Sequence, residues 1–380
     1  MDKVIPSNYR ICSNCVLDSN TTNITFDDKG VCNFCNNFFK EKPSINFSNE
    51  KKLELFELLL EKIKESGKGK QYDSIVGLSG GVDSTYVALI AKENGLNPLA
   101  VHFDNGWNTE ISTNNIEQVC NKINIDLYTH VVDWEEFKDL QLSFLKAGVA
   151  NAEMPTDHGI FALLHHLALK FKVNYILDGW NIASELPRDG FVDGGFAYSD
   201  LKHLKAIQKE FGNIPLKTFP QMSLIQKFWW KKFRNIQQVA ILNYIDYDKS
   251  KVKEILKEKL GWKEYGGKHH ENLFTKWHQT VYLPTRFKFD KRRLHLSDLI
   301  LSGQISKEQA LEELAMPTIS IDEGKKLEEY VMKKLSLSLD EYEKILTSPP
   351  VPHSYYPSSE KFTSLYKRIK RLSPPKIFTR

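Results

Sequence analysis

A glycine-rich turn between a predicted strand and a predicted helix has the residue types of a phosphate-binding loop. The strand is expected at 74–78, and the helix is expected to begin near Asp83. Backbone N–H groups in such a turn bind anions together with the positive end of the helix dipole. Asp83 alone would repel phosphate, so we expect it to hold a Mg²⁺ ion that bridges to nucleotide phosphates. The predicted phosphate-binding residues are Ser79, Gly80, Gly81, Asp83, Ser84 and Thr85.

Four of the five cysteines form two C-x-x-C pairs, Cys12 with Cys15 and Cys32 with Cys35, and sixteen residues separate the pairs. Each pair can present two thiolates to one ion, which favours a structural, tetrahedral Zn²⁺ site. Two disulfides and a redox-active pair are the alternatives, and the lack of a secretory signal disfavours the disulfides. Cys120 stands alone in a predicted helix, where we expect a buried and unreactive thiol.

Short apolar runs alternate with predicted helices from residue 72 to about residue 215. The runs lie at 74–78, 99–103, 127–132 and 175–177, and the helices at 83–94, 109–124, 134–147 and 157–171. This alternation predicts an α/β fold with a parallel sheet of about five strands and helices on both faces. We expect a zinc-binding module at 1–45, this α/β domain at 46–215 and a mainly helical substrate-binding region at 216–380, with a polar linker at 41–50.

The composition is that of an ordinary globular protein, with 41% hydrophobic and 26% charged residues in 380. No apolar run approaches the roughly 20 residues that span a bilayer, so we expect a cytoplasmic protein with no membrane partner. A formal net charge of +4 gives little support for a nucleic-acid partner. Cations and aromatics nevertheless concentrate at 227–234 and 286–295, as a solvated surface or as a site for a phosphorylated substrate.

The Ser-Gly-Gly-Val-Asp-Ser run at 79–84 resembles the pyrophosphate loop of the ATP pyrophosphatase superfamily, the PP-loop or HUP-like enzymes. It differs from the lysine-bearing loop of kinases and GTPases and from the dinucleotide turn. The resemblance implies that ATP and Mg²⁺ are used to adenylylate a substrate oxygen, with release of pyrophosphate. It also implies that Glu185 joins Asp83 as a Mg²⁺ ligand. The residues that it adds to the ATP site are His102, Phe103, Asp104, Gly106, Asp178 and Gly179.

The segments 261–272, 274–277 and 283–297, with Met154-Pro-Thr-Asp-His158 and the four-cysteine module, resemble the N-acetyl sugar amidotransferase family of surface-polysaccharide and lipopolysaccharide biosynthesis. That family adenylylates the acetamido oxygen of a nucleotide-linked N-acetyl sugar, and ammonia displaces AMP to leave an acetamidino group. The resemblance also implies a separate glutaminase subunit and a cyclase-like subunit that channels ammonia. It implies a catalytic Lys268 at the α-phosphate, and substrate contacts from Asp157, His158, His269, Lys276, Arg292 and Arg293.

Each of these cations and histidines has an alternative role in tying loops together, and Asp157 has one as a helix cap. Three other functions remain open. A tRNA-thiolating enzyme would share the zinc module and the loop but needs reactive cysteines. An asparagine-synthetase type of enzyme lacks its glutaminase domain here. A zinc-ribbon nucleic-acid-binding protein would leave the intact loop without a role.

Overall fold

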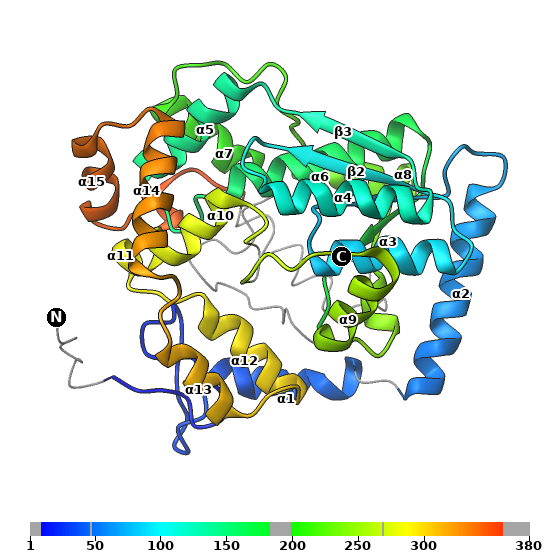
Figure 1. Ribbon diagram of the computed structural model, residues 1–380, viewed down its shortest axis with the longest axis horizontal. Coiled ribbons are helices and arrows are strands. Elements are labelled where there is room, and N and C mark those ends of the chain that lie inside the picture. The colour runs from blue at the N-terminus through cyan, green and yellow to red at the C-terminus, as the bar shows by residue number, and fades with distance from the viewer. Residues whose placement is uncertain (1–8, 46–47, 183–198, 268–269, 360–380) are drawn as a thin grey trace.

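The computed structural model describes residues 9–45, 48–182, 199–267 and 270–359 (Figure 1). A five-stranded parallel sheet has the order β3-β2-β1-β4-β5, which confirms the predicted fold class. The strands are β1 (Ser74–Gly77), β2 (Pro98–Asp104), β3 (Leu127–Val131), β4 (Tyr175–Asp178) and β5 (Gln237–Ala240). The strand order reverses between β1 and β4. Open α/β sheets bind their ligands at such a point, in the crevice beyond the carboxyl ends of the strands.

Alternate side chains along the strands enter two separate cores, one on each face of the sheet. Val76 and Leu177 pack into one core, whereas Ile75 and Ile176 pack into the other. Helices α2 (Asn49–Gly67), α3 (Val82–Glu93), α4 (Glu110–Ile123) and α9 (Lys249–Leu260) contribute to the first core. Helices α5 (Trp134–Ala147), α6 (Met154–Lys170) and α7 (Leu201–Phe211) contribute to the second. Strands β1, β2 and β4 are therefore covered on both faces, as their apolar runs predict.

Apart from β5 and α9, the C-terminal region is mainly helical, and most of its buried apolar residues pack into the same core as α5 and α6. Its helices are α8 (Leu224–Phe233), α10 (Leu273–Trp277), α11 (Leu283–Phe287), α12 (Arg292–Ser302), α13 (Lys307–Ala315), α14 (Ile321–Leu335) and α15 (Leu339–Thr347). A π-helical turn, His278–Tyr282, joins α10 to α11. Such turns are rare and occur often at functional sites. No helix in the described part of the chain is long and apolar enough to cross a membrane.

The N-terminal module consists of the two cysteine pairs, a turn between them and helix α1 (Asn33–Ile45). The turn is closed by hydrogen bonds between Asp27 and Val31 and between Gly30 and Asp27, with Gly30 at a φ of +75°. In Figure 1 the module lies beside α12 and α13, away from the strands. The module is thus packed against the C-terminal region, although it precedes the sheet in sequence.

Three local expectations differ from the structure. Helix α1 continues through residues 41–45, so the polar linker is shorter than 41–50. Strand β5 lies beyond residue 215, outside the predicted α/β domain. The sequence pattern did not indicate it, because its two glutamines interrupt the apolar run by which buried strands are found. Strand β3 is an edge strand whose side chains are half-buried or exposed, and Val131 is 67% exposed.

Candidate active site

A cavity of about 500 Å³ opens at the carboxyl ends of β1, β2 and β4. The phosphate loop and the end of β4 line one part of it, and residues from the C-terminal region line another. This combination matters because the two parts are far apart in sequence. The lining residues from the loop and β4 include Ser79, Gly81, Asp83, Ser84, Asp178 and Gly179, and those from the C-terminal region include Lys249, Glu271, Asn272, Thr275, Gln279 and Lys291.

The loop between β1 and α3 is held in a shape that only glycine allows. Gly80 has a φ of +78°, and a Cβ atom there would lie 2.4 Å from the carbonyl oxygen of Ser112. The Gly80 carbonyl accepts a hydrogen bond of 2.9 Å from the indole N–H of Trp262. Within the loop, the Ser79 N–H donates to Ser84 Oγ at 3.2 Å, and the two serine hydroxyls lie 3.1 Å apart. The amino end of α3 is therefore preformed beside the cavity as an anion site.

Asp83 lies in the first turn of α3 and lines the cavity. Its Oδ1 accepts a short hydrogen bond from the Tyr247 hydroxyl. The backbone of Gly179 passes so close that a Cβ atom there would lie 3.2 Å from the Cβ of Asp83. The end of β4 thus reaches the loop carboxylate, and oxygen ligands of this kind fit Mg²⁺.

Asp178 lines the cavity at the end of β4 and also organises the backbone that follows. Its Oδ1 accepts from the Trp180 N–H at 2.9 Å, and its Oδ2 accepts from the side-chain amide of Gln238 in β5 at 2.5 Å. These bonds connect the carboxylate to the neighbouring strand. Glu185, the second predicted Mg²⁺ ligand, falls outside the described residues.

Thr85 has a different environment from the other residues of the predicted phosphate set. Its side chain is fully buried on the inner face of α3 and is not part of the cavity lining. Gly80 also lies outside the lining and contributes through its backbone turn. Within the predicted phosphate set, the hydroxyl-bearing residues that line the cavity are therefore Ser79 and Ser84.

His102 and Phe103, at the end of β2, line the cavity where adenosine recognition is predicted. The Leu78 carbonyl lies 3.0 Å from His102 Nδ1, and the Asn108 amide lies 3.1 Å from Nε2. Because a carbonyl only accepts, Nδ1 carries the proton and Nε2 accepts from Asn108. Burial lowers the pKa of His102, so the ring stays neutral near pH 7.

Asp104 and Gly106 shape the turn after β2 and do not line the cavity. Asp104 Oδ1 accepts from the Gly106 N–H at 2.9 Å and from the Asn108 amide at 3.0 Å. On its outer side the turn is held by Lys334 of α14, whose ammonium donates to the Gly106 carbonyl. That ammonium lies 4.9 Å from the centre of the Trp107 ring and also faces two other aromatic rings, those of Trp134 and Tyr330.

Replacing Lys334 by Met is expected to destabilise the protein by about 1–3 kcal/mol, because a charged hydrogen bond and cation–π contacts are lost. We also expect the KM for ATP to rise, since the turn after β2 loses its outer support. Thermal unfolding and ATP titration of the variant measure the two effects. Lys333→Met, at an exposed position of the same helix, is the control. Unchanged stability and KM in Lys334→Met would contradict this role.

The predicted residues of α6 separate into one that faces the cavity and one that does not. Asp157, in the first turn, lines the cavity. His158 is buried, and its Nε2 accepts a hydrogen bond of 3.2 Å from the Met222 N–H. Its ring also stacks on Phe219. Asp157 thus lies in the cavity wall and its substrate contact stays a prediction, whereas His158 is buried against Met222 and Phe219.

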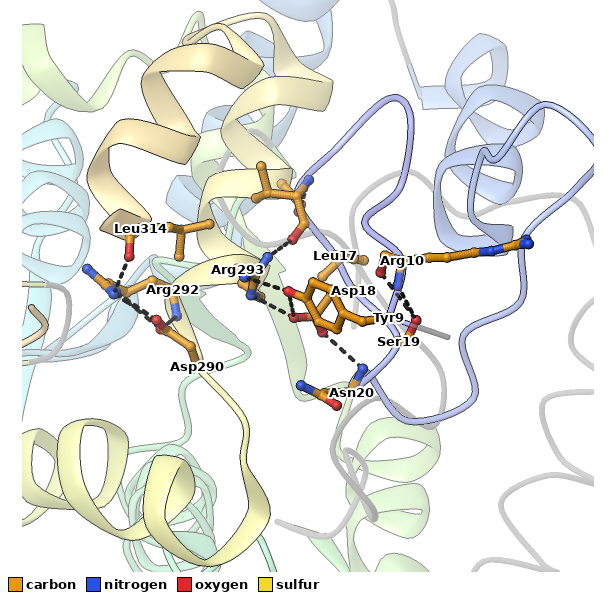
Figure 2. Close-up of polar contacts among 12 residues, drawn as sticks. Tyr9, Arg10, Leu17, Asp18, Ser19, Asn20, Asp290, Arg292, Arg293 and Leu314 are labelled. Atoms are coloured by element: carbon orange, nitrogen blue, oxygen red, sulfur yellow. Dashed lines mark hydrogen bonds and ion pairs between the residues drawn. The ribbon is translucent and has the colours of Figure 1, made fainter. Parts of the chain in front are cut away.

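Lys276, Arg292 and Arg293 lie outside the cavity lining and have protein partners, and their predicted substrate contacts stay predictions. Lys276 pairs with Glu323 of α14. Arg292 binds Asp290 at 2.7 Å and three carbonyls at the end of α13, and Arg293 binds Asp18 at 3.0 Å (Figure 2). None of the three lines the cavity. Lys268 and His269 fall outside the described residues.

Glu271, Lys291 and Lys249 are charged residues of the C-terminal region that line the cavity and that the sequence prediction omitted. Glu271 Oε1 accepts from the Ser79 hydroxyl at 3.4 Å, and a Cβ atom on Gly81 would lie 2.9 Å from it. The available signal was adjacency, since Glu271 follows the predicted Lys268 and His269, and Lys291 precedes the predicted Arg292.

The four predicted zinc ligands come together in one buried cluster. Their sulfur atoms lie within 4.8 Å of one another, with Cys12 to Cys35 at 3.8 Å and Cys15 to Cys32 at 3.9 Å. A tetrahedral ion with Zn–S bonds of about 2.3 Å requires sulfur separations of about 3.8 Å. No cysteine forms a disulfide, and burial raises the pKa of the separate Cys120 to about 11. The donor set therefore fits one structural Zn²⁺.

Two protein-family models match separate parts of the chain. Residues 271–372 match the C-terminal domain of the WbpG-like LPS biosynthesis proteins, and residues 73–159 match the queuosine biosynthesis protein QueC. No curated protein sequence matches the chain.

Solved structures with similarity to the chain include two synthetases. The NH3-dependent NAD synthetase from Campylobacter jejuni is 15% identical, with 72% of this chain and 100% of that chain covered and a TM-score of 0.30. The NMN synthetase from Francisella tularensis is 15% identical, with 61% and 94% covered and a TM-score of 0.30. A predicted tRNA methyltransferase subunit from Methanocaldococcus jannaschii is 16% identical, with 49% and 74% covered and a TM-score of 0.29. TM-scores this low carry no argument about function.

Proposed function

Because the chain joins a PP-loop ATP-using domain to a C-terminal domain of the WbpG-like LPS biosynthesis type, we propose that it is an amidotransferase for a nucleotide-linked N-acetyl sugar. The acetamido oxygen of the sugar attacks the α-phosphorus of ATP, and pyrophosphate leaves. Ammonia then adds to the activated carbon, and the oxygen departs with AMP. The product carries an acetamidino group in place of the acetamido group.

The single observation that supports this proposal is the shared cavity. Phosphate-loop residues and C-terminal residues line one space of about 500 Å³. A second substrate held by the C-terminal region would therefore lie beside a nucleotide held by the loop. Bringing two reactants together in this way supplies a large part of the catalysis of a two-substrate reaction.

The residues of the loop would bind and orient the phosphates. Ser79 and Ser84 line the cavity, and the amino end of α3, which begins at Val82, lies beside them. Asp83, with Glu185 as the proposed second ligand, would hold a Mg²⁺ that neutralises phosphate charge. Tyr247 donates to one oxygen of Asp83 and so fixes the carboxylate. Lys268 remains a proposed contact of the α-phosphate.

Ammonia would come from partner subunits. Four of the five cysteines belong to the zinc cluster, and the pKa of Cys120 is raised to about 11 by burial. A thiol with this pKa is a poor nucleophile for a glutaminase reaction at neutral pH. We therefore propose a separate glutaminase and a cyclase-like subunit that passes ammonia. Free ammonium at high concentration is expected to replace both. We propose that this reaction takes place in the cytoplasm.

The purified chain should be incubated with ATP, Mg²⁺ and ammonium chloride across a panel of UDP- and CMP-linked N-acetyl sugars. We expect AMP and pyrophosphate with one sugar, and a product mass in which O is replaced by NH. Mass spectrometry of the sugar and the nucleotide measures this result. AMP release that is independent of sugar and stimulated by tRNA would contradict the proposal and favour an RNA-modifying enzyme.

A further inference from the structure

Lys291 immediately precedes α12 and lies in the wall of the active-site cavity. Burial is the main cause that lowers the pKa of His278 to about 3, and the positive charge of the nearby Lys291 is the second cause. Over the part of the chain that the structure describes, no hydrogen bond or ion pair involves the Lys291 ammonium. A cation in a cavity without a protein partner is available to an anionic ligand.

The rest of the cavity wall is acidic. Within the described lining, five carboxylates face two lysines. The carboxylates are those of Asp83, Glu153, Asp157, Asp178 and Glu271, and the lysines are Lys249 and Lys291. A polyphosphate entering this space is repelled by the carboxylates unless cations offset them. Lys291 lies within residues 271–372, which match the WbpG-like C-terminal domain, whereas Lys249 begins α9 before that segment.

The two arginines after Lys291 fix the start of α12 (Figure 2). Arg292 binds Asp290 and donates to the carbonyls of Glu313 and Met316, both at 2.9 Å. Arg293 pairs with Asp18 at 3.0 Å and donates to the Val16 carbonyl at 2.7 Å. Because Asp18 is 3% exposed, its separation from Arg293 would leave a buried charge without its partner.

The backbone around the first cysteine pair is bonded to α13 as well as to Arg293. The Lys307 ammonium, from α13, donates to the Cys12 carbonyl at 2.7 Å and to the Ser13 carbonyl at 3.0 Å. The Val16 N–H donates to Ser297 of α12 at 3.3 Å, and its side chain packs on Leu296. The cysteine module is therefore bonded to α12 and α13 through the backbone around its metal ligands.

We propose that Lys291 binds a phosphate group of the ligand in the cavity, and that the cysteine module positions Lys291 through the ion pair of Asp18 with Arg293. This inference rests on the proposed function, which supplies two sources of phosphate: ATP and the diphosphate or phosphate of the nucleotide-linked sugar. Lys291 contacts the ligand, whereas Arg293 and Asp18 act through Lys291 as positioning residues.

The binding test uses the full chain and isothermal titration calorimetry with Mg²⁺. One arm titrates α,β-methylene-ATP, which cannot release pyrophosphate, and the other titrates UDP- and CMP-linked N-acetyl sugars. Lys291→Met is expected to weaken binding about tenfold in one arm, because a charge-assisted hydrogen bond is lost. That arm identifies the source of the phosphate, and Lys291→Arg should recover part of the affinity.

Lys288→Met is the matched control, since Lys288 is exposed, lies close to α12 and does not line the cavity. It should bind both ligands as the unmodified protein does. Unchanged affinity of Lys291→Met in both arms would overturn the inference. If the unmodified protein binds no sugar nucleotide, the proposed function fails. The ATP arm then decides the role of Lys291 by itself, and unchanged affinity for ATP refutes that role.

The positioning role is tested with Arg293→Met, Asp18→Asn and the double variant Lys291→Met/Arg293→Met. Each single variant should weaken the same ligand that Lys291→Met weakens, while zinc content and the circular dichroism spectrum stay unchanged. In the Lys291→Met background, removing Arg293 should cost no further affinity, because its effect passes through Lys291. A full additional loss in the double variant would overturn the positioning role. If Arg293→Met does not fold, the ligand affinity of Asp18→Asn tests the same ion pair.

Discussion

Asp83→Asn is expected to lower the rate of AMP formation by about 100- to 1000-fold, the usual cost of removing a group that stabilises transition-state charge. The substitution keeps the size of the side chain and removes its charge. Asp83 lies in the first turn of α3 beside the serine hydroxyls of the loop, so its proposed Mg²⁺ would touch the phosphates. Pyrophosphate release at saturating ATP and Mg²⁺ is the measurement.

Two comparisons make the Asp83 result specific. Tyr247→Phe removes the hydroxyl that donates to Asp83 and should cost about tenfold, as expected of a group that orients a metal ligand. Asp28→Asn, on the exposed turn of the cysteine module, should leave the rate unchanged. A normal rate in a folded Asp83→Asn protein would contradict the proposed metal-binding role.

Cys32→Ser is expected to abolish zinc binding and to destabilise the N-terminal module by more than about 4 kcal/mol, since a structural ion contributes directly to folding. Cys32 lies 3.9 Å from Cys15 in the buried cluster. The loss should appear as an early unfolding transition and as zinc absent from elemental analysis. We also expect weaker ligand binding, because the module no longer holds the start of α12.

Cys120→Ser is the matched control for the zinc prediction. Its thiol is half-buried on α4 and is not part of the four-cysteine cluster. Zinc content should stay at one ion per chain in this variant. Full zinc content in Cys32→Ser, or equal loss in Cys120→Ser, would contradict the assignment of the ligands.

The phosphate loop and the cysteine cluster could be predicted from sequence because short-range geometry determines them. The loop needs a positive φ at Gly80, which glycine adopts without strain. The cysteine pairs need only the spacing that lets each present two sulfurs to one ion. The neighbouring strands β1, β2 and β4 could also be predicted, since each lies in an apolar run of the sequence.

The C-terminal cations could not be assigned in this way. Lys291, Arg292 and Arg293 are adjacent and carry the same charge, and the sequence prediction selected the two arginines. Their roles differ because Asp18 and the end of α13 occupy the guanidinium groups, while the cavity faces Lys291. These partners come from distant segments, and no local periodicity reports them.

Glu271 illustrates the same limit at the phosphate loop. Apart from its adjacency to the predicted Lys268 and His269, nothing local distinguishes it from other carboxylates in the C-terminal region. Its contact with Ser79 at 3.4 Å accompanies an isolated β-bridge between residues 108 and 272 and a hydrogen bond from the Thr109 N–H to the Glu271 carbonyl. A long-range pairing of this kind brings the end of β2 and the start of α10 together, and it cannot be read from either segment alone.

The position of β5 has a practical consequence for dividing the chain. A fragment that ends near residue 215 would lose β5 and leave β4 with unpaired backbone groups along its whole length. Such exposed edges promote aggregation. The fragment would also lose Gln238, the partner of Asp178 in the active site. Chimaeras that exchange the C-terminal region between relatives should therefore join after α9, at about residue 261, where the sheet is already complete.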